Sequence, residues 1–301
     1  MQAVQSKSPE NLAINLRRPT FELDQALARD WHGGDVFRTA FFNAMSMLFP
    51  LGEKFFIDSV RAYRADITDT RLLDEITAFQ GQESIHRLQH QRYNERLCEL
   101  RGYDLDVMEE PSRRRQAWVR KNLPMRRQLA GTVASEHITA IMADAMLRNA
   151  DTMRDADPLV SELWRWHGIE ETEHKSVAFD VYAAIGGTVK ERRQALLFST
   201  WYFFKDTFHN MRIMLRHDGK SKSLRLWLGG LNYLFGKPGI LRRILPDYLA
   251  YYRRDFHPWQ IDNRELITAW LSEQQHASWS APRQAQNPGS GNTIDREAHT
   301  R

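Results

Sequence analysis

The sequence predicts an all-α protein, built as a four-helix bundle with additional helices at its C-terminal end. Apolar residues recur at spacings of three and four through most of the 301 residues, which is the period of an amphipathic helix. No alternating apolar and polar run bounded by hairpin turns occurs, so strands are not expected. The lengths of the polar connections then indicate how the helices are joined.

The first two long helices form the first expected hairpin. One helix is expected over about residues 35–64, with Pro50 inside the pattern as a kink. A short turn at about 65–68 separates it from a second helix over about 69–100. Gly102, just past the end of the second helix, is a typical stop signal. Because the turn is short, the two helices should be antiparallel neighbours.

The next two helices form a second hairpin. An arginine-rich connection over about 101–123 should hold one short helix, and a third long helix should begin near Pro124 and end near Asn149. A turn at about 151–157 leads to a fourth helix over 158–185, stopped by Gly186. Two hairpins joined by one crossover of about 20 residues is the connectivity of a ferritin-like four-helix bundle.

The rest of the chain adds helices and two polar ends. Further helical regions are expected over about 189–216 and 224–254, with a last amphipathic helix over 263–275. We therefore divide the chain into an N-terminal extension (1–30), a helical metal-binding domain (31–275, with the four-helix core at about 35–186) and a tail (276–301). The tail is rich in Pro, Gly, Ser and Asn and is expected to be disordered.

Composition excludes several classes of protein. With 42% hydrophobic residues the chain can build a large core, so disorder of the whole chain is excluded. The single cysteine, Cys98, allows no internal disulfide and no cysteine metal cage, which fits a reducing compartment. The first 25 residues contain no signal peptide, and the longest apolar run, about 196–204, is too short to span a membrane. We expect a cytoplasmic protein.

Two short motifs carry the chemistry. Glu83-x-x-His86 lies midway along the second expected helix, and Glu171-x-x-His174 lies midway along the fourth. A spacing of three residues puts both side chains of a pair on one helix face. A third copy, Glu273-x-x-His276, lies in a polar stretch beside the tail, and we interpret it as accidental.

Single glutamates on the other two helices complete the pattern. Glu53 and Glu136 lie in apolar surroundings with no arginine three or four residues away, where an unpaired charge is costly. Each lies roughly 20–25 Å from its turn, at the height of the Glu-x-x-His pair on the partner helix. One glutamate from each of two helices and Glu-x-x-His from each of the other two is the ligand set of dinuclear carboxylate bundles.

Another histidine shares the stripe of the fourth helix. His167 precedes Glu171 by four residues, whereas Glu170 and Glu173 point away from the stripe and are left out. His137 points away from Glu136 and is expected to support the site or the core. Four carboxylates balance two divalent cations, and Glu83 and Glu171 are the expected bridging groups. The predicted ligands, for two ions of iron or else manganese or zinc, are Glu53, Glu83, His86, Glu136, His167, Glu171 and His174.

Several sequence blocks resemble a known family. FPLGEKFF, FQGQESIH, ASEHITA, WHGIEETEHK and FHPW (256–259) are together similar to a bacterial family described as predicted metal-dependent hydrolases, over about residues 30–260. This resemblance implies a metal site. The ligand pattern alone also resembles the di-iron N-oxygenases of aryl-amines, whose fourth helix has a histidine, a glutamate four residues on and a histidine three further, as His167, Glu171 and His174 do here.

Three functions remain open at this point. Glutamate and histidine ligation in a helical bundle favours O2-dependent oxidation of a small or lipid-like organic substrate at a di-iron site. The alternative is a metal-dependent hydrolase, in which the cations lower the pKa of water. The third is a non-catalytic helical protein that associates with a membrane or handles metal.

The C-terminal third is basic and aromatic. Residues 205–254 contain eleven Lys/Arg against three aspartates, a difference of +8, whereas the whole chain carries +4. This region has three possible roles. It packs on the bundle as an outer layer, it contacts the anionic inner face of the membrane, or it forms the entrance of a binding site for a lipid-like substrate. No nucleic-acid motif accompanies the charge, so nucleic acid is not expected as a partner. A homodimer is left open.

Overall fold

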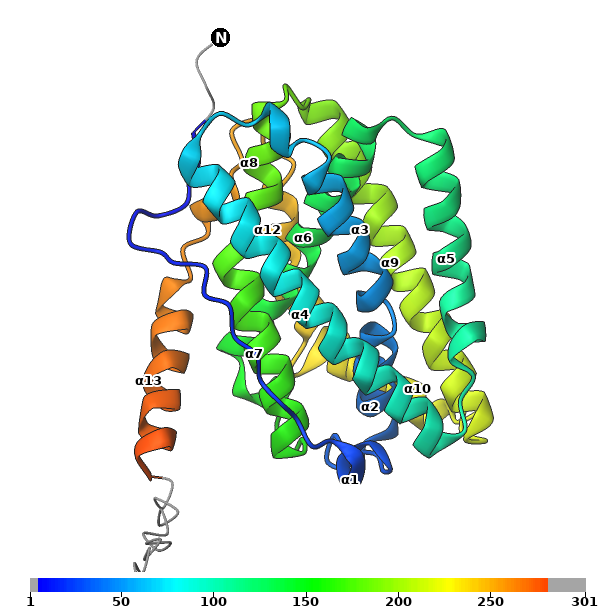
Figure 1. The fold of residues 1–301 in the computed structure, drawn as a ribbon. Helices are drawn as coiled ribbons and strands as arrows, with labels where there is room; N and C mark the ends of the chain where they lie inside the picture. The colour runs from blue at the N-terminus through cyan, green and yellow to red at the C-terminus, as the bar shows by residue number, and fades with distance from the viewer. Residues whose placement is uncertain (1–4, 281–301) are drawn as a thin grey trace, which may run out of the picture.

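The computed structural model describes residues 5–280, and their side chains up to Gln274 (Figure 1). These described residues form helices and connecting loops, with one isolated bridge between His32 and Ala156 and no strand. The all-α prediction is therefore confirmed. Residues 281–301, most of the predicted disordered tail, lie outside the described residues, and 276–280 belong to the last helix.

Four central helices form the two predicted hairpins (Figure 1). In the first, α3 (Phe49–Arg61) and α4 (Thr70–Arg101) are joined through the 3-10 turn η1 (Arg64–Asp66). In the second, α6 (Met125–Arg148) and α7 (Pro158–His174) are joined through η2 (Ala150–Thr152). Helix α3 packs against α4 and α6, and α7 packs against the same two helices. The bundle therefore closes around a shared interior.

The expected first helix is two helices. Within residues 35–64, α2 (Val36–Ser46) ends before Met47 and α3 begins at Phe49. A separate one-turn helix, α1 (Asp24–Leu27), precedes them. The prediction of a single kinked helix over 35–64 was therefore wrong. Pro50 lies in the first turn of α3, where its missing N–H costs nothing because N–H groups there have no intrahelical partner.

The crossover contains more helix than expected. Helix α5 (Leu105–Asn122) fills nearly all of it, with the Asp104 carboxylate accepting a hydrogen bond from the N–H of Val107 at its start. Pro124 is extended and precedes α6 rather than opening it. In Figure 1, α5 stands at the edge of the bundle beside α9 (Val189–His217), and the two helices are in contact.

The expected fourth helix is interrupted directly after His174. Helix α8 (Val177–Ala184) follows a two-residue break. Both residues of the break are held by the later segment 259–263: Lys175 Nζ donates to the Ile261 carbonyl and to Asn263, and Ser176 Oγ accepts from Trp259 Nε1. These side-chain contacts fix the end of α7 and hence the position of His174.

The helix expected over 224–254 is four short pieces, so that prediction was wrong. Pro238 and Gly239, which has φ +72°, interrupt it, because proline lacks an N–H and only glycine readily adopts that backbone conformation. The pieces are α10 (Leu224–Leu231), η3 (Asn232–Gly236), α11 (Ile240–Arg243) and α12 (Leu245–Ala250). They lie over α2 and α6 as an outer layer.

The two ends of the described chain lie along the outside of the bundle (Figure 1). Residues 5–23 run without helix beside α4 and α7, where Gln82 of α4 and Arg17 are among the contacts. After η4 (Pro258–Gln260), α13 (Arg264–Ser280) packs against α7 through Trp270 and Ile267. None of the helices within 5–280 is long and apolar enough to cross a membrane.

Candidate metal centre

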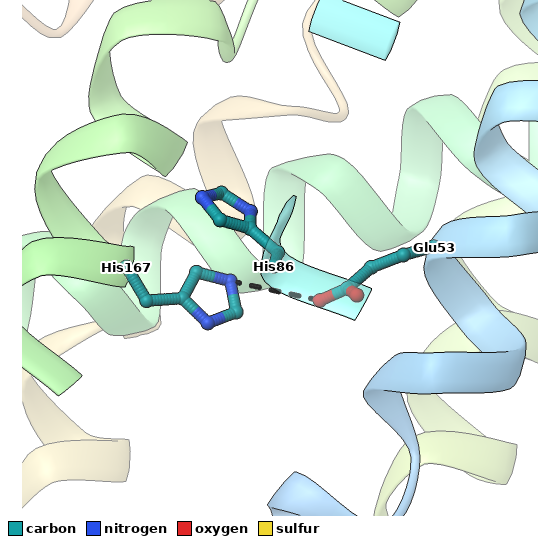
Figure 2. A group of neighbouring side chains, drawn as sticks. All are labelled: Glu53, His86 and His167. Atoms are coloured by element: carbon teal, nitrogen blue, oxygen red, sulfur yellow. Dashed lines mark ion pairs between the residues drawn. The ribbon is translucent and has the colours of Figure 1, made fainter. Parts of the chain in front are cut away.

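All seven predicted ligands are buried and lie together between the four central helices. Their potential ligand atoms form two groups, each within 4.8 Å: Glu53, His86 and His167, and Glu83, Glu171 and His174. Figure 2 shows the first group, in which Glu53 of α3 points toward His167 of α7 at 3.9 Å. The remaining residue, Glu136 of α6, lies 3.5 Å from His174. Every central helix thus contributes at least one carboxylate or imidazole.

Glu171 lies at the junction of the two groups. Its Oε1 is 2.9 Å from His167 Nε2, 3.6 Å from His174 Nε2 and 3.7 Å from His86 Nδ1. Glu83 Oε1 is 3.1 Å from His174 Nε2. A carboxylate that touches the imidazoles of both groups is placed to join two cations.

The outer nitrogen of His86 is held by a buried carboxylate. His86 Nε2 donates to Glu170 Oε2 at 2.9 Å. Glu170 also accepts from Arg17 and from Trp166 Nε1, which hold it in place. Burial raises the pKa of Glu170, and the hydrogen bond and charge of Arg17 oppose that rise. With the proton on Nε2, the lone pair of His86 is on Nδ1, which faces Glu171 and has no hydrogen-bond partner among the described residues.

His174 is oriented in the same way by an amide. His174 Nδ1 donates to the Gln82 carbonyl oxygen at 2.8 Å. The Gln82 amide nitrogen donates to Glu173 at 2.7 Å and to the Asn15 backbone carbonyl at 3.0 Å, which fixes which end of the amide is the acceptor. The inner nitrogen of His174 is therefore Nε2, which faces Glu83 and Glu171 and can bind a cation once it has released its proton.

A chain of hydrogen bonds sets the tautomer of His167. The Asn94 amide nitrogen donates to the Ser46 backbone carbonyl, so its oxygen accepts from the Ser46 hydroxyl at 2.6 Å. Ser46 Oγ then accepts from His90 Nδ1, and His90 Nε2 accepts from His167 Nδ1 at 2.7 Å. This direction makes Nε2 the inner nitrogen of His167, which forms a hydrogen bond of 2.9 Å with Glu171, faces Glu53, and can bind a cation once it has released its proton. Burial keeps the pKa of His90 well below its ordinary value, as a neutral ring requires.

The interior of the site fits cations. Both oxygens of Glu53, Glu83 and Glu136 are buried without a hydrogen-bond partner among residues 5–280, which is costly unless a positive charge lies between them. Four carboxylates balance two divalent ions, and three imidazole nitrogens point to the same place. Metal-binding histidines typically donate their other N–H to a supporting group. Here His86 donates to Glu170, His174 donates to Gln82, and His167 donates to His90. The residues therefore fit two metal ions.

Without cations, protons hold this site together. Burial and repulsion from Glu83 and Glu171 raise the pKa of Glu53 and of Glu136 well above the ordinary value. Burial lowers the pKa of His174, but the carboxylates of Glu171 and Glu83 beside its Nε2 outweigh it, and the pKa is raised well above 6.5. Burial alone would raise the pKa of Glu171, and hydrogen bonds from His167 and His174 instead lower it well below 4.5. Cations that bind here must displace protons.

Most of the residues that orient the candidate ligands were not predicted from the sequence. His90 had a signal, because it follows His86 by one helical turn and faces the same interior. Glu170 and Glu173 do not reach the centre, in agreement with their exclusion, but they orient His86 directly and His174 through Gln82. Arg17, which pairs with both glutamates at 3.1 and 2.6 Å, had no signal because it comes from the N-terminal extension.

The other candidates lie apart from the site. His137 Nε2 bonds to the Asp247 carbonyl at 3.2 Å and its ring stacks on Tyr251, so it ties α12 to α6. Glu273, of the third Glu-x-x-His, is exposed on α13 and pairs with Arg165. That motif is accidental with respect to this centre.

Two cavities reach the site. One of about 540 Å³ lies between α3, α5, α6 and α9 and is bordered by Glu53 and Thr139. A smaller one of about 40 Å³ is bordered by His167, Glu171 and Thr139. Thr139 lines both cavities, and its hydroxyl donates to Glu171 Oε2 at 2.5 Å.

Four central helices that converge on buried carboxylates and imidazoles form a candidate metal centre of the glutamate- and histidine-ligated class. The family model described as "predicted metal-dependent hydrolase" matches residues 15–262, so the chain belongs to this family. The resemblance seen in the sequence blocks is confirmed. Neither the curated proteins nor the solved structures compared with the chain include a match.

Proposed function

We propose that the protein is a cytoplasmic di-iron enzyme that uses dioxygen to oxidise a small or lipid-like organic substrate. The observation that supports this most is the donor set: four carboxylates and three imidazoles converge in a buried centre bordered by a largely apolar cavity. Family membership supports metal dependence. The cytoplasmic location rests on the single cysteine, which fits a reducing compartment.

The protein's own residues perform the positioning. Two bound ferrous ions would supply the electrons for the reduction of dioxygen. Glu53, Glu83, Glu136 and Glu171 would hold them together with His86, His167 and His174. Phe49 and Phe203, which line both cavities, exclude water from the approach to the centre. Thr139 holds a proton on Oγ1 between Glu171 and the cavities, where it can be passed to a reacting group.

Hydrolysis is the second candidate, and the family description favours it. In that reaction the cations would lower the pKa of water and stabilise developing negative charge. The same ligands and cavities would serve, with a carboxylate such as Glu53 at the cavity wall accepting the proton of the water. A non-catalytic, metal-handling role would use the centre but not the cavities.

Metal identity and response to air separate these functions. The full chain is purified without chelator, its metals are measured by elemental analysis, and absorption spectra are recorded anaerobically and after admission of air. About two irons per chain, with a new near-ultraviolet band after air, is the expected result. Two zinc or manganese ions with an unchanged spectrum would replace oxidation by hydrolysis, and a chain that takes up no metal would exclude both.

A further inference from the structure

The larger of the two cavities at the site extends along two helices, α9 and α6. Its wall on α9 runs from Glu191 to Asp206, a distance of about 22 Å at about 1.5 Å per residue. On α6 it runs from Arg127 to Thr139. Its volume of about 540 Å³ lies in the range of sites that enclose whole small organic molecules.

One end of the cavity meets the metal centre. The Glu53 carboxylate, a predicted ligand, forms part of its wall, and so does Thr139, which bonds to Glu171. The smaller cavity shares Phe49, Thr139 and Phe203 with it and reaches His167. A molecule lying in the larger cavity would therefore have one end beside the predicted ligands.

The walls offer few free charges. Apart from Glu53, the charged residues that line the cavity occur as pairs: Arg115 lies 2.5 Å from Asp206, and Arg127 lies 3.6 Å from Glu191. The remaining wall is largely aromatic and aliphatic, with Phe49, Phe55 and Phe56 from α3 facing Ala195 and Phe203 from α9. Such a surface favours an apolar occupant.

The rim exposes large aromatic side chains. Trp118 on α5 is 58% exposed and Phe198 on α9 is 66% exposed, and both border the cavity. They are placed where an apolar molecule entering between α5 and α9 would first make contact.

We propose that this cavity is the substrate site of the metal centre and that it takes a molecule with a long apolar chain, an acyl or alkyl chain. The reacting end lies beside Thr139 and Glu53, and the chain runs along α6 past Gly131. The reaction rests on the proposed function, whereas binding of the chain does not depend on it.

Gly131 provides a way to shorten the cavity. It lines the wall on α6, and no described heavy atom lies within 4 Å of a Cβ built at this position. It is two helical turns, about 12 Å, from Thr139. Gly131→Leu should therefore block the far part of the cavity without straining the helix. Gly229→Leu is the matched control, because Gly229 is also a helical glycine with open space but does not line the cavity.

The probe is a series of saturated fatty acids from octanoate to hexadecanoate, titrated by calorimetry into the metal-loaded protein below their micelle concentrations. Each buried methylene should strengthen binding about fourfold until the cavity is full. Gly131→Leu should weaken hexadecanoate by about tenfold or more and change octanoate by less than about twofold. Gly229→Leu should behave as the wild type.

Three results would overturn the proposal. The first is a wild-type affinity that does not increase with chain length, and the second is equal binding of hexadecanoate by the wild type and Gly131→Leu. The third is tight binding of a compact aromatic such as naphthalene without binding of the fatty acids. The metal content of the same samples separates the two claims. Chain binding by a protein that takes up no metal contradicts the proposed function alone. Bound metal without chain binding contradicts the cavity assignment alone.

Discussion

At the residue scale, the site depends on three imidazole rings whose outer nitrogens form hydrogen bonds with supporting residues and whose inner nitrogens face the buried carboxylates. His90 has this supporting role for His167, through a hydrogen bond of 2.7 Å. His90→Leu should lower metal affinity about 10- to 100-fold, because His167 loses the partner that sets its tautomer. A competition titration against a chelator measures this.

His90→Gln is the informative companion variant. Its amide oxygen can accept the same hydrogen bond from His167 Nδ1, so part of the lost affinity should return. If the two variants bind metal as tightly as the wild type, the hydrogen-bond chain from Asn94 to His167 has no role in the centre.

The unpartnered glutamates predict an unusual effect on stability. Both oxygens of Glu136 are buried without a hydrogen-bond partner in the described part of the chain, so without metal this carboxyl destabilises the fold. Glu136→Met should raise the Tm of the metal-free protein, by about 2–4 °C for each kcal/mol relieved, and should reduce the further rise in Tm caused by metal. Differential scanning calorimetry with and without metal tests both.

Glu273→Met is the matched control for that experiment. It removes a glutamate from a Glu-x-x-His motif that is exposed on α13, so neither Tm should change appreciably. A metal-free Tm that falls in Glu136→Met would contradict the account.

The raised pKa values determine how metal binding depends on pH. Burial and the repulsion from Glu83 and Glu171 raise the pKa of Glu53 and Glu136, so these groups retain protons that a cation must displace. Metal affinity should therefore increase as pH rises from about 5 to about 8, with protons released on binding. Titrations in buffers of different ionisation enthalpy count those protons. Binding that releases none over this range would contradict the assignment of these groups.

At the scale of elements, the N-terminal extension is a structural part of the site. Arg17 bonds to Glu170 and Glu173, which are fully buried on α7. Arg17→Met leaves two buried carboxylates without their cation and should lower the free energy of unfolding by about 3–5 kcal/mol. Urea unfolding measures it, with the neighbouring exposed Arg18→Met as the control. Equal loss in the two variants would remove Arg17 from the support of the site.

The sequence predicted the elements where periodicity and short turns act together. The register of Glu83, His86, Glu171 and His174 followed from helical spacing, and the two hairpins followed from loop length. Predictions failed where tertiary contacts decide: the break after His174 depends on contacts with residues 259–263. The supporting groups Arg17 and Gln82 were missed because no local pattern marks a partner from a distant segment.

At the scale of the whole molecule, the basic C-terminal region forms an outer layer over α2 and α6, while one of its apolar faces remains exposed. Leu224, Leu228, Leu231 and Phe235 follow a helical stripe and are 49–71% exposed. Residues 205–254 also contain eleven Lys/Arg. Because exposed apolar and basic side chains together favour an anionic membrane surface, contact with such a membrane stays a prediction. Vesicles containing phosphatidylserine should sediment the protein at low salt and much less at high salt.

Leu228→Glu, on the exposed stripe, should weaken that sedimentation, whereas Leu159→Glu, at the start of α7, should not. Neutralising Arg242 or Arg243 is a poor test of the membrane contact, because both side chains donate to backbone carbonyls of residues 235–238 and their loss would also disturb the local fold. Equal sedimentation with neutral vesicles would exclude an electrostatic contact.

The most direct test of the central claim is anomalous X-ray diffraction from crystals of the full chain loaded with ferrous iron. The account predicts two iron peaks about 3.5–4 Å apart, one near His86 and His167 and the other near His174, with Glu171 between them. A single peak, or peaks only on the surface while the seven side chains remain without metal, would contradict it.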